Sequence, residues 1–168
     1  FNWDIIQYTG DVVLLNIREP TCMSLKYTYA QGDGTNLEYA DREFGIAYSN
    51  SVIEHLSTHE NQIKFAHEMR RVGRAVWCQT PARWFFIEPH YITPFIHFFP
   101  QEWQKKLLRN FSVWGLITRP PQNYVDGMVD EIRLLTYTEM KFLFPDCEII
   151  KEKFLFMTKS YIAVRKND

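Results

Sequence analysis

The residues best suited to chemistry lie between Phe44 and Leu56, where the sequence reads FGIAYSNSVIEHL. An apolar run, Phe44–Tyr48, leads into a small polar turn, and the adjacent pair Glu54-His55 follows. Ligands of open α/β sheets bind outside the carboxyl ends of parallel strands. A carboxylate and an imidazole just past such a strand therefore predict a binding or proton-transfer site. The alternative is that the turn only caps the next helical segment.

The elements that must position this segment follow from apolar runs alternating with helical stripes. The predicted parallel strands are Asp11–Asn16, Tyr27–Ala30, Phe44–Tyr48 and Arg74–Gln79. A terminal antiparallel hairpin is predicted from Cys147–Phe156 and Lys159–Arg165. The pattern indicates an α/β fold with a Rossmann-like, doubly wound and mostly parallel sheet, closed by this hairpin.

Capping patterns predict where the helices begin. Ser57 with Glu60, and Thr136 with Glu139, match the capping box, in which the cap and the third helical residue exchange hydrogen bonds. The first box precedes an apolar stripe of Ile63, Ala66, Met69 and Val72, and the second opens a short helix ended by Pro145. Gly10 is a predicted C-cap, which makes residues 3–8 the tail of a further helix.

Composition narrows the functional classes. The 168 residues form one predicted domain, with 19 basic and 20 acidic side chains and a formal net charge of −1. This balance provides no electrostatic footprint for nucleic acid or an anionic membrane. The sequence has no apolar run long enough to span a membrane. Its three scattered cysteines suit a reducing compartment, so we predict a cytoplasmic location.

Residues 83–124 interrupt the alternation with a segment rich in proline and aromatic residues. We predict that it forms a lid-like insertion over the carboxyl ends of the strands, and that Trp103, Leu107, Phe111 and Trp114 pack on one helical face. His90 and His97 are seven residues apart, a spacing that could suit two metal ligands on a helix, but the neighbouring prolines disrupt helical geometry and no cysteine lies near. The sequence therefore predicts no metal site.

Three collinear segments carry a resemblance to a known family. The segment around FGIAYSNSVIEHL resembles the fourth-strand motif of class I S-adenosylmethionine-dependent methyltransferases, particularly the type-11 methyltransferase domain. TPARWFFIEPHYITPFIHFFP and the C-terminal segment beginning LLTYTEM extend the likeness from about Asp11 onward. The resemblance implies S-adenosylmethionine as cofactor and methyl transfer to an O, N or C atom of a small molecule.

The resemblance also implies roles for individual residues. The implied cofactor-binding residues are Asn16, Gly32, Asp33, Gly34, Ser49, Asn50 and Ser51. Asn16 stands where the family usually has a ribose-binding acid, for which Glu19 is a possible substitute. Asp33 matches the acid that accepts from the adenine amine, and the alternative is a turn-forming role between two glycines.

On the acceptor side, the implied catalytic base is His55 first and His90 second. The implied substrate-binding residues are Arg83, His90 and Tyr91, which we expect to approach the turn at 49–55. Some relatives with an E-x-x-E-H pattern hold a divalent metal there. Ser51 replaces the first acid here, which leaves a poor magnesium set. A structural role for Glu54, capping or pairing with Arg70 or Arg71, stays open.

The family's glycine-rich D-x-G-x-G-x-G turn is absent from this sequence, and residues 1–9 are too short to supply the strand before it. We therefore predict a domain without its first strand, with a gap in the sheet or exposed edges that a homo-oligomer could cover. Weak or absent cofactor binding is expected. The alternatives are a non-catalytic methyltransferase-like remnant or interaction module and, third, a nicotinamide-binding Rossmann protein, whose G-x-G-x-x-G loop is also absent.

Overall fold

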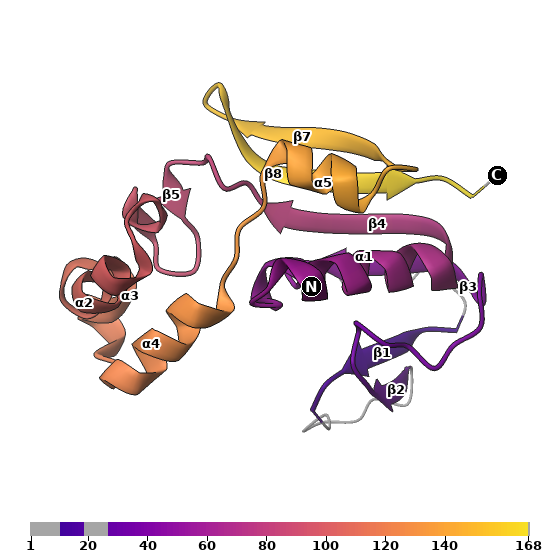
Figure 1. Ribbon diagram of the computed structural model, residues 1–168, viewed down its shortest axis with the longest axis horizontal. Coiled ribbons are helices and arrows are strands. Elements are labelled where there is room, and N and C mark those ends of the chain that lie inside the picture. Colours follow the sequence, from indigo (N-terminus) through magenta and orange to yellow (C-terminus); the bar gives the residue numbers. More distant parts are fainter. Residues whose placement is uncertain (1–10, 19–26, 168) are drawn as a thin grey trace.

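The computed structural model describes residues 11–18 and 27–167 (Figure 1). The strands are β1 (Val13–Asn16), β2 (Thr28–Gln31), β3 (Phe44–Asn50), β4 (Gly73–Pro81), β5 (Ile87–Glu88), β6 (Thr93–Pro94), β7 (Glu148–Phe154) and β8 (Met157–Arg165). The helices are α1 (His59–Val72), α2 (Gln101–Phe111), α3 (Val113–Thr118), α4 (Gln122–Glu131) and α5 (Tyr137–Leu143), with 3₁₀ turns η2 (Ile53–His55) and η3 (Ile96–Phe98). None of these helices combines the length and apolar character that crossing a bilayer requires. The helix predicted at residues 3–8 lies outside the described residues.

The main sheet has four strands in the order β3-β4-β8-β7. β3 and β4 run parallel, with Ser49 opposite Cys78, while β4–β8 and β8–β7 are antiparallel. This confirms the predicted parallel pairing and the C-terminal hairpin. The polar turn after β3 and the end of β4 consequently meet at one edge of the sheet.

β1 and β2 form a separate parallel pair (Figure 1). Their pairing agrees with the prediction, but among the described residues neither strand pairs with the main sheet. β3 is therefore an edge strand within residues 11–18 and 27–167, and Ile46 on it is 43% exposed.

Helices α1 and α5 cover one face of the main sheet through a shared apolar core. Its members include Ala66 and Met69 of α1, Cys78 of β4, and Met140 and Phe144 in and after α5. α5 begins with the predicted capping box of Thr136 and Glu139. The N-cap predicted at Ser57 is wrong, because Thr58 is the residue whose side chain accepts from the Asn61 amide.

The segment from β5 to α4, which we call the insertion, has a second apolar core that contains Tyr91, Leu108 and Val125. This core extends past the predicted boundary at Tyr124 into α4. The predicted single packing face is partly wrong, because Trp103 and Phe111 are 57% and 73% exposed. Trp114 leaves this face because buried Ser112, whose hydroxyl accepts from the Gly115 amide, begins a separate helix.

Candidate functional site

Glu54 is held at the carboxyl edge of the sheet by a turn that leaves β3. Ser51 begins this turn with a positive φ of 54° and hydrogen bonds to Gln79 through both its amide and its hydroxyl. The Glu54 side chain is fully buried, and its Oε2 accepts from the Thr80 hydroxyl at 2.8 Å. Its Oε1 has no hydrogen-bond partner. Burial raises the pKa of Glu54 above its ordinary value, and its hydrogen bonds and the neighbouring histidines offset this only in part.

The alternative in which Glu54 pairs with Arg70 or Arg71 is wrong. Arg70 forms an ion pair with Asp146, and Arg71 forms ion pairs with Glu68 and Asp41. Both arginines lie at the opposite end of α1, which begins just after η2, so they are about three helical turns from Glu54. The partners of Glu54 are instead Thr80 and the two histidines described next.

His55 and His90 meet beside Glu54. Their Nε2 atoms are 3.1 Å apart, and the two rings are nearly perpendicular at 89°. His90 lies in the loop between β5 and β6. The insertion therefore places it beside His55, although the two residues are 35 positions apart in the sequence. Nε2 of His90 is also 3.9 Å from Oε1 of Glu54.

A carboxylate orients each imidazole from behind. Nδ1 of His90 lies 2.6 Å from Oε1 of Glu88, and Nδ1 of His55 lies 3.0 Å from Oε1 of Glu131. Burial lowers the pKa of His90, but the hydrogen bond to Glu88 and the charges of Glu88, Glu54 and Glu131 outweigh it, so the net pKa is raised. A carboxylate at Nδ1 fixes the tautomer that leaves Nε2 free to accept a proton or bind a cation.

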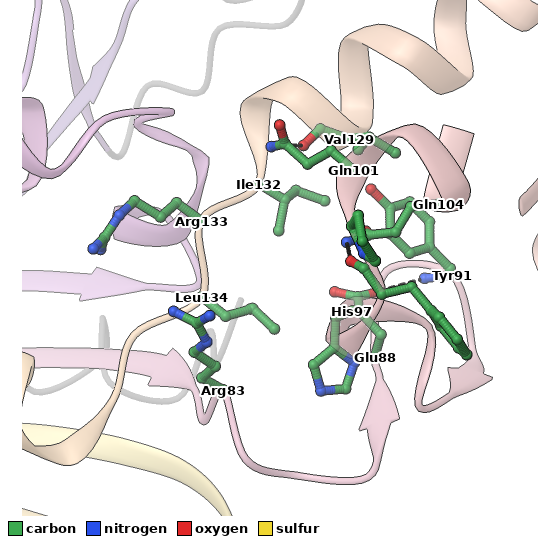
Figure 2. Close-up of a pocket in the computed structure, with 12 residues that line it drawn as sticks. Arg83, Glu88, Tyr91, His97, Gln101, Gln104, Val129, Ile132, Arg133 and Leu134 are labelled. Atoms are coloured by element: carbon green, nitrogen blue, oxygen red, sulfur yellow. Dashed lines mark hydrogen bonds between the residues drawn. The ribbon is translucent and has the colours of Figure 1, made fainter. Parts of the chain in front are cut away.

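Two cavities flank this cluster. One of about 230 Å³ lies at the ends of β3 and β4 and is bordered by Ser51, Gln79 and Pro89. The other, of about 300 Å³, lies between the sheet and the insertion (Figure 2). Figure 2 shows Arg83, at the end of β4, across this cavity from Glu88 and His97 of the insertion.

Residues 5–75 of the chain match the family model described as a methyltransferase domain. This segment is similar to the methyltransferase domain family. It spans β1 to the start of β4 and therefore includes the turn with Glu54 and His55. A search of curated proteins found no significant match.

Solved structures show that the rest of the chain shares the fold of such a domain. A SAM-dependent methyltransferase from Methanosarcina mazei is 12% identical with a TM-score of 0.53, over 96% of this chain and 84% of that chain. A protein from Pyrococcus horikoshii OT3 is 13% identical with a TM-score of 0.52, over 99% and 76%. A provisionally assigned zinc-dependent alcohol dehydrogenase from Rhodobacter sphaeroides is 14% identical with a TM-score of 0.51, over 84% and 67%. At such identities the likeness establishes a Rossmann-like fold and not a reaction.

The adenine-side residues expected of a methyltransferase domain lie around β1 and β2. Asn16 ends β1, and its Oδ1 accepts from the Arg18 amide. Oδ1 of Asp33 accepts from both the amide and the hydroxyl of Thr35 at 2.8 Å, so this oxygen closes the turn. A Cβ on Gly34 would lie 2.8 Å from the Phe65 ring, so close packing against Phe65 favours glycine at this position.

The structure brings together some of the expected acceptor-side residues and separates others. His55 and His90 are in contact, whereas Arg83 and Tyr91 both line the larger cavity, and Tyr91 also belongs to the core of the insertion. Sequence analysis did not select Glu88 or Glu131 as site residues. Glu131 lies 76 residues from His55 at the end of α4, and no local pattern in the sequence marks this contact.

Proposed function

We propose that this methyltransferase domain transfers a methyl group from S-adenosylmethionine to an O, N or C atom of a small molecule. The observation that carries the proposal is the carboxylate-oriented pair at the carboxyl edge of β3, in which His55 comes from the segment that resembles the family's fourth-strand motif and His90 comes from the insertion. The family match and the Methanosarcina mazei relative, described as a SAM-dependent methyltransferase, support the donor.

Methyl transfer requires the protein mainly to align the acceptor with the methyl group and, where needed, to remove a proton from the acceptor. A sulfonium methyl group is intrinsically reactive, so holding the acceptor in line with it supplies most of the catalytic effect. His55 is the first candidate to accept the acceptor's proton, because its side chain is 31% exposed against 17% for His90. The larger cavity, which Arg83 and Tyr91 line together with Glu88, is the space proposed for the acceptor.

The proposed cofactor contacts follow the edge from β1 to β3. Asn16 would contact the ribose, Asp33 the adenine amine through the oxygen that does not bind Thr35, and the backbone at 49–51 the methionine end. Gly32 and Gly34 would let the backbone approach the ligand. Arg83, His90 and Tyr91 would contact the acceptor.

Calorimetry with S-adenosylhomocysteine tests the donor, and transfer of labelled methyl from S-adenosylmethionine to a panel of hydroxyl, amine and carbon-acid acceptors tests the reaction. The 168-residue chain is expected to bind only weakly. Asp33→Ala should weaken binding of S-adenosylhomocysteine to the protein by about 1–3 kcal/mol, because it leaves a polar group of the cofactor unpaired. Absence of both binding and transfer in the unsubstituted protein would overturn the proposal.

A second candidate is a methyltransferase-like module that has the fold but does not bind the cofactor. The division of the sheet favours it, since β1–β2 and β3 do not join into one continuous edge among the described residues. Failure of S-adenosylhomocysteine to bind the protein, together with retained folding, is the result expected for this candidate. Methyl transfer to any acceptor excludes it.

A further inference from the structure

We propose that Glu54, His55 and His90 form a binding site for a divalent first-row transition ion, with zinc the ion that fits best. One ligand atom from each residue lies within 4.8 Å of the others. The proposal rests on this geometry and holds whether or not the domain transfers methyl groups.

The two imidazoles present lone pairs to one another. A carboxylate faces Nδ1 of each ring, so Nδ1 carries the ring proton and donates it to Glu88 or Glu131. Each neutral ring then has an unprotonated Nε2, and these two acceptors are 3.1 Å apart. In a tetrahedral zinc site, Zn–N distances of about 2.0–2.1 Å place neighbouring nitrogens about 3.3 Å apart. The observed separation is close to that value.

Glu54 supplies the third ligand atom. Its Oε1 is buried without a hydrogen-bond partner and lies 3.9 Å from Nε2 of His90. A buried carboxylate oxygen with no donor is costly, and a bound cation removes that cost. The Thr80 hydroxyl holds the other oxygen, Oε2, which leaves Oε1 available to an ion.

Glu88 and Glu131 have the geometry of groups that orient metal ligands. Histidine ligands in proteins characteristically donate their second N–H to a carboxylate or carbonyl, which fixes the ring and strengthens the nitrogen as a donor. Both histidines here have this arrangement. The three carboxylates at the cluster are those of Glu54, Glu88 and Glu131. None of the hydrogen bonds and ion pairs described above joins them to an arginine or a lysine, so a dication would balance their charge when both imidazoles are neutral.

The donor set selects among metals. Magnesium and calcium prefer several oxygen ligands, and this site offers one carboxylate oxygen and two nitrogens. Two histidines and a glutamate with an open fourth position are typical of catalytic zinc sites. An acceptor oxygen or a water molecule at the open position would lose its proton more readily on the ion. The ion would thereby take over the role proposed above for a histidine base.

The alternative is that a proton, rather than a metal, lies between the two Nε2 atoms. This requires one imidazole to be doubly protonated, and the net upward shift of the His90 pKa is compatible with it. The two possibilities differ in their response to added zinc.

The test is a calorimetric titration of chelator-treated protein with Zn²⁺, with Co²⁺ as a spectroscopic probe and Mg²⁺ as a control ion. We expect one Zn²⁺ per chain, four- or five-coordinate d–d absorption with Co²⁺, and no binding of Mg²⁺. His90→Ala and His55→Ala should each weaken Zn²⁺ binding by roughly 100-fold or more, and Glu88→Gln by roughly 10-fold, because it removes an orienting carboxylate.

His67→Ala is the matched control, because this histidine lies on α1 outside the cluster with its side chain 68% exposed. Its Zn²⁺ affinity should equal that of the unsubstituted protein. Circular dichroism of each metal-free variant separates lost binding from lost folding. Zn²⁺ binding that is absent, or equally weakened by His67→Ala and His90→Ala, overturns the proposal. A proton resonance shared by the two Nε2 atoms in zinc-treated protein overturns it as well.

Discussion

The main sheet with α1 and α5, which we call the sheet unit, and the insertion differ in how their residues are assembled. The sheet unit builds its core from regular alternation along strands and one stripe along a helix, as at Val76, Cys78, Ala66 and Met69. The insertion has only two-residue strands and short helices around Tyr91, Leu108 and Val125. Each has its own apolar core, and Figure 1 shows the insertion helices beside the end of β4 rather than over a sheet face.

The contacts that join the two units are largely polar. The Arg133 amide, just after α4, donates to the Glu54 carbonyl at 2.7 Å, and the Ser57 amide donates to the Glu131 carbonyl at 3.1 Å. Buried Gln62 of α1 donates to the carbonyls of Ile53 and Arg133. The candidate site lies at this junction, with Glu54 and His55 from the sheet unit and His90 from the insertion. Docking of the insertion therefore completes the site.

The largest expected effect compares the two cores. Phe144→Ala empties a fully buried position in the sheet unit and should lower the free energy of unfolding by about 3–5 kcal/mol. Leu108→Ala in the insertion should cost about 2–5 kcal/mol, because Leu108 is also fully buried. Denaturant unfolding measures both values, and hydrogen exchange locates them.

The comparison predicts different exchange patterns for the two variants. Leu108→Ala should speed exchange in α2–α4 and leave the amides of α1 protected, because the two apolar cores are separate. Phe144→Ala should speed exchange throughout. Equal loss of protection in α1 for both variants would show that the two units unfold as one.

Sequence analysis predicted the features that depend on the periodicity of apolar residues. It did not predict the contacts that depend on single side chains from distant parts of the chain. The strand pairing of β3 with β4 and the terminal hairpin follow from apolar runs, and the position of His55 just past the end of β3 follows from the polar turn there. The contacts of His55 with His90 and with Glu131 could not be predicted from such patterns. They depend on how the β5–β6 loop and α4 fold back toward the end of β3. The split at Ser112 was missed because a serine inside a helical stripe resembles any solvent-facing polar position.

The acid stability of the sheet unit gives an intermediate effect. Glu68 binds Arg71 and accepts from the Leu37 amide, and mainly the Arg71 hydrogen bond lowers its pKa from 4.5 to about 2. A lowered folded pKa gives stability that is fully present above pH 4.5 and is lost as pH falls toward 2. The loss can reach about 3 kcal/mol. Unfolding midpoints measured across this pH range check it.

Glu68→Gln is the variant for this measurement. It should be less stable at pH 7 and should lose much of the acid dependence between pH 4.5 and 2. An unchanged acid slope in Glu68→Gln would assign the acid sensitivity to other carboxylates.

An ion pair in the insertion is the contrast. Asp130→Asn removes the exposed ion pair with Lys105 and should change the free energy of unfolding by less than about 1 kcal/mol.

The smallest expected effect concerns the helices of the insertion, whose short length makes intrinsic propensity count. Gly127 lies in the interior of α4, and a Cβ added there meets no atom within 4 Å. Gly127→Ala should therefore stabilise the protein by about 0.5–1 kcal/mol. Gly115 is the matched contrast, because a Cβ there would lie 2.3 Å from the Leu108 carbonyl oxygen, so Gly115→Ala should destabilise by about 1–3 kcal/mol. Thermal unfolding of the two variants measures both changes. If Gly127→Ala gives no gain, helix propensity does not limit the insertion, and its stability comes from packing around Leu108 and Val125 alone.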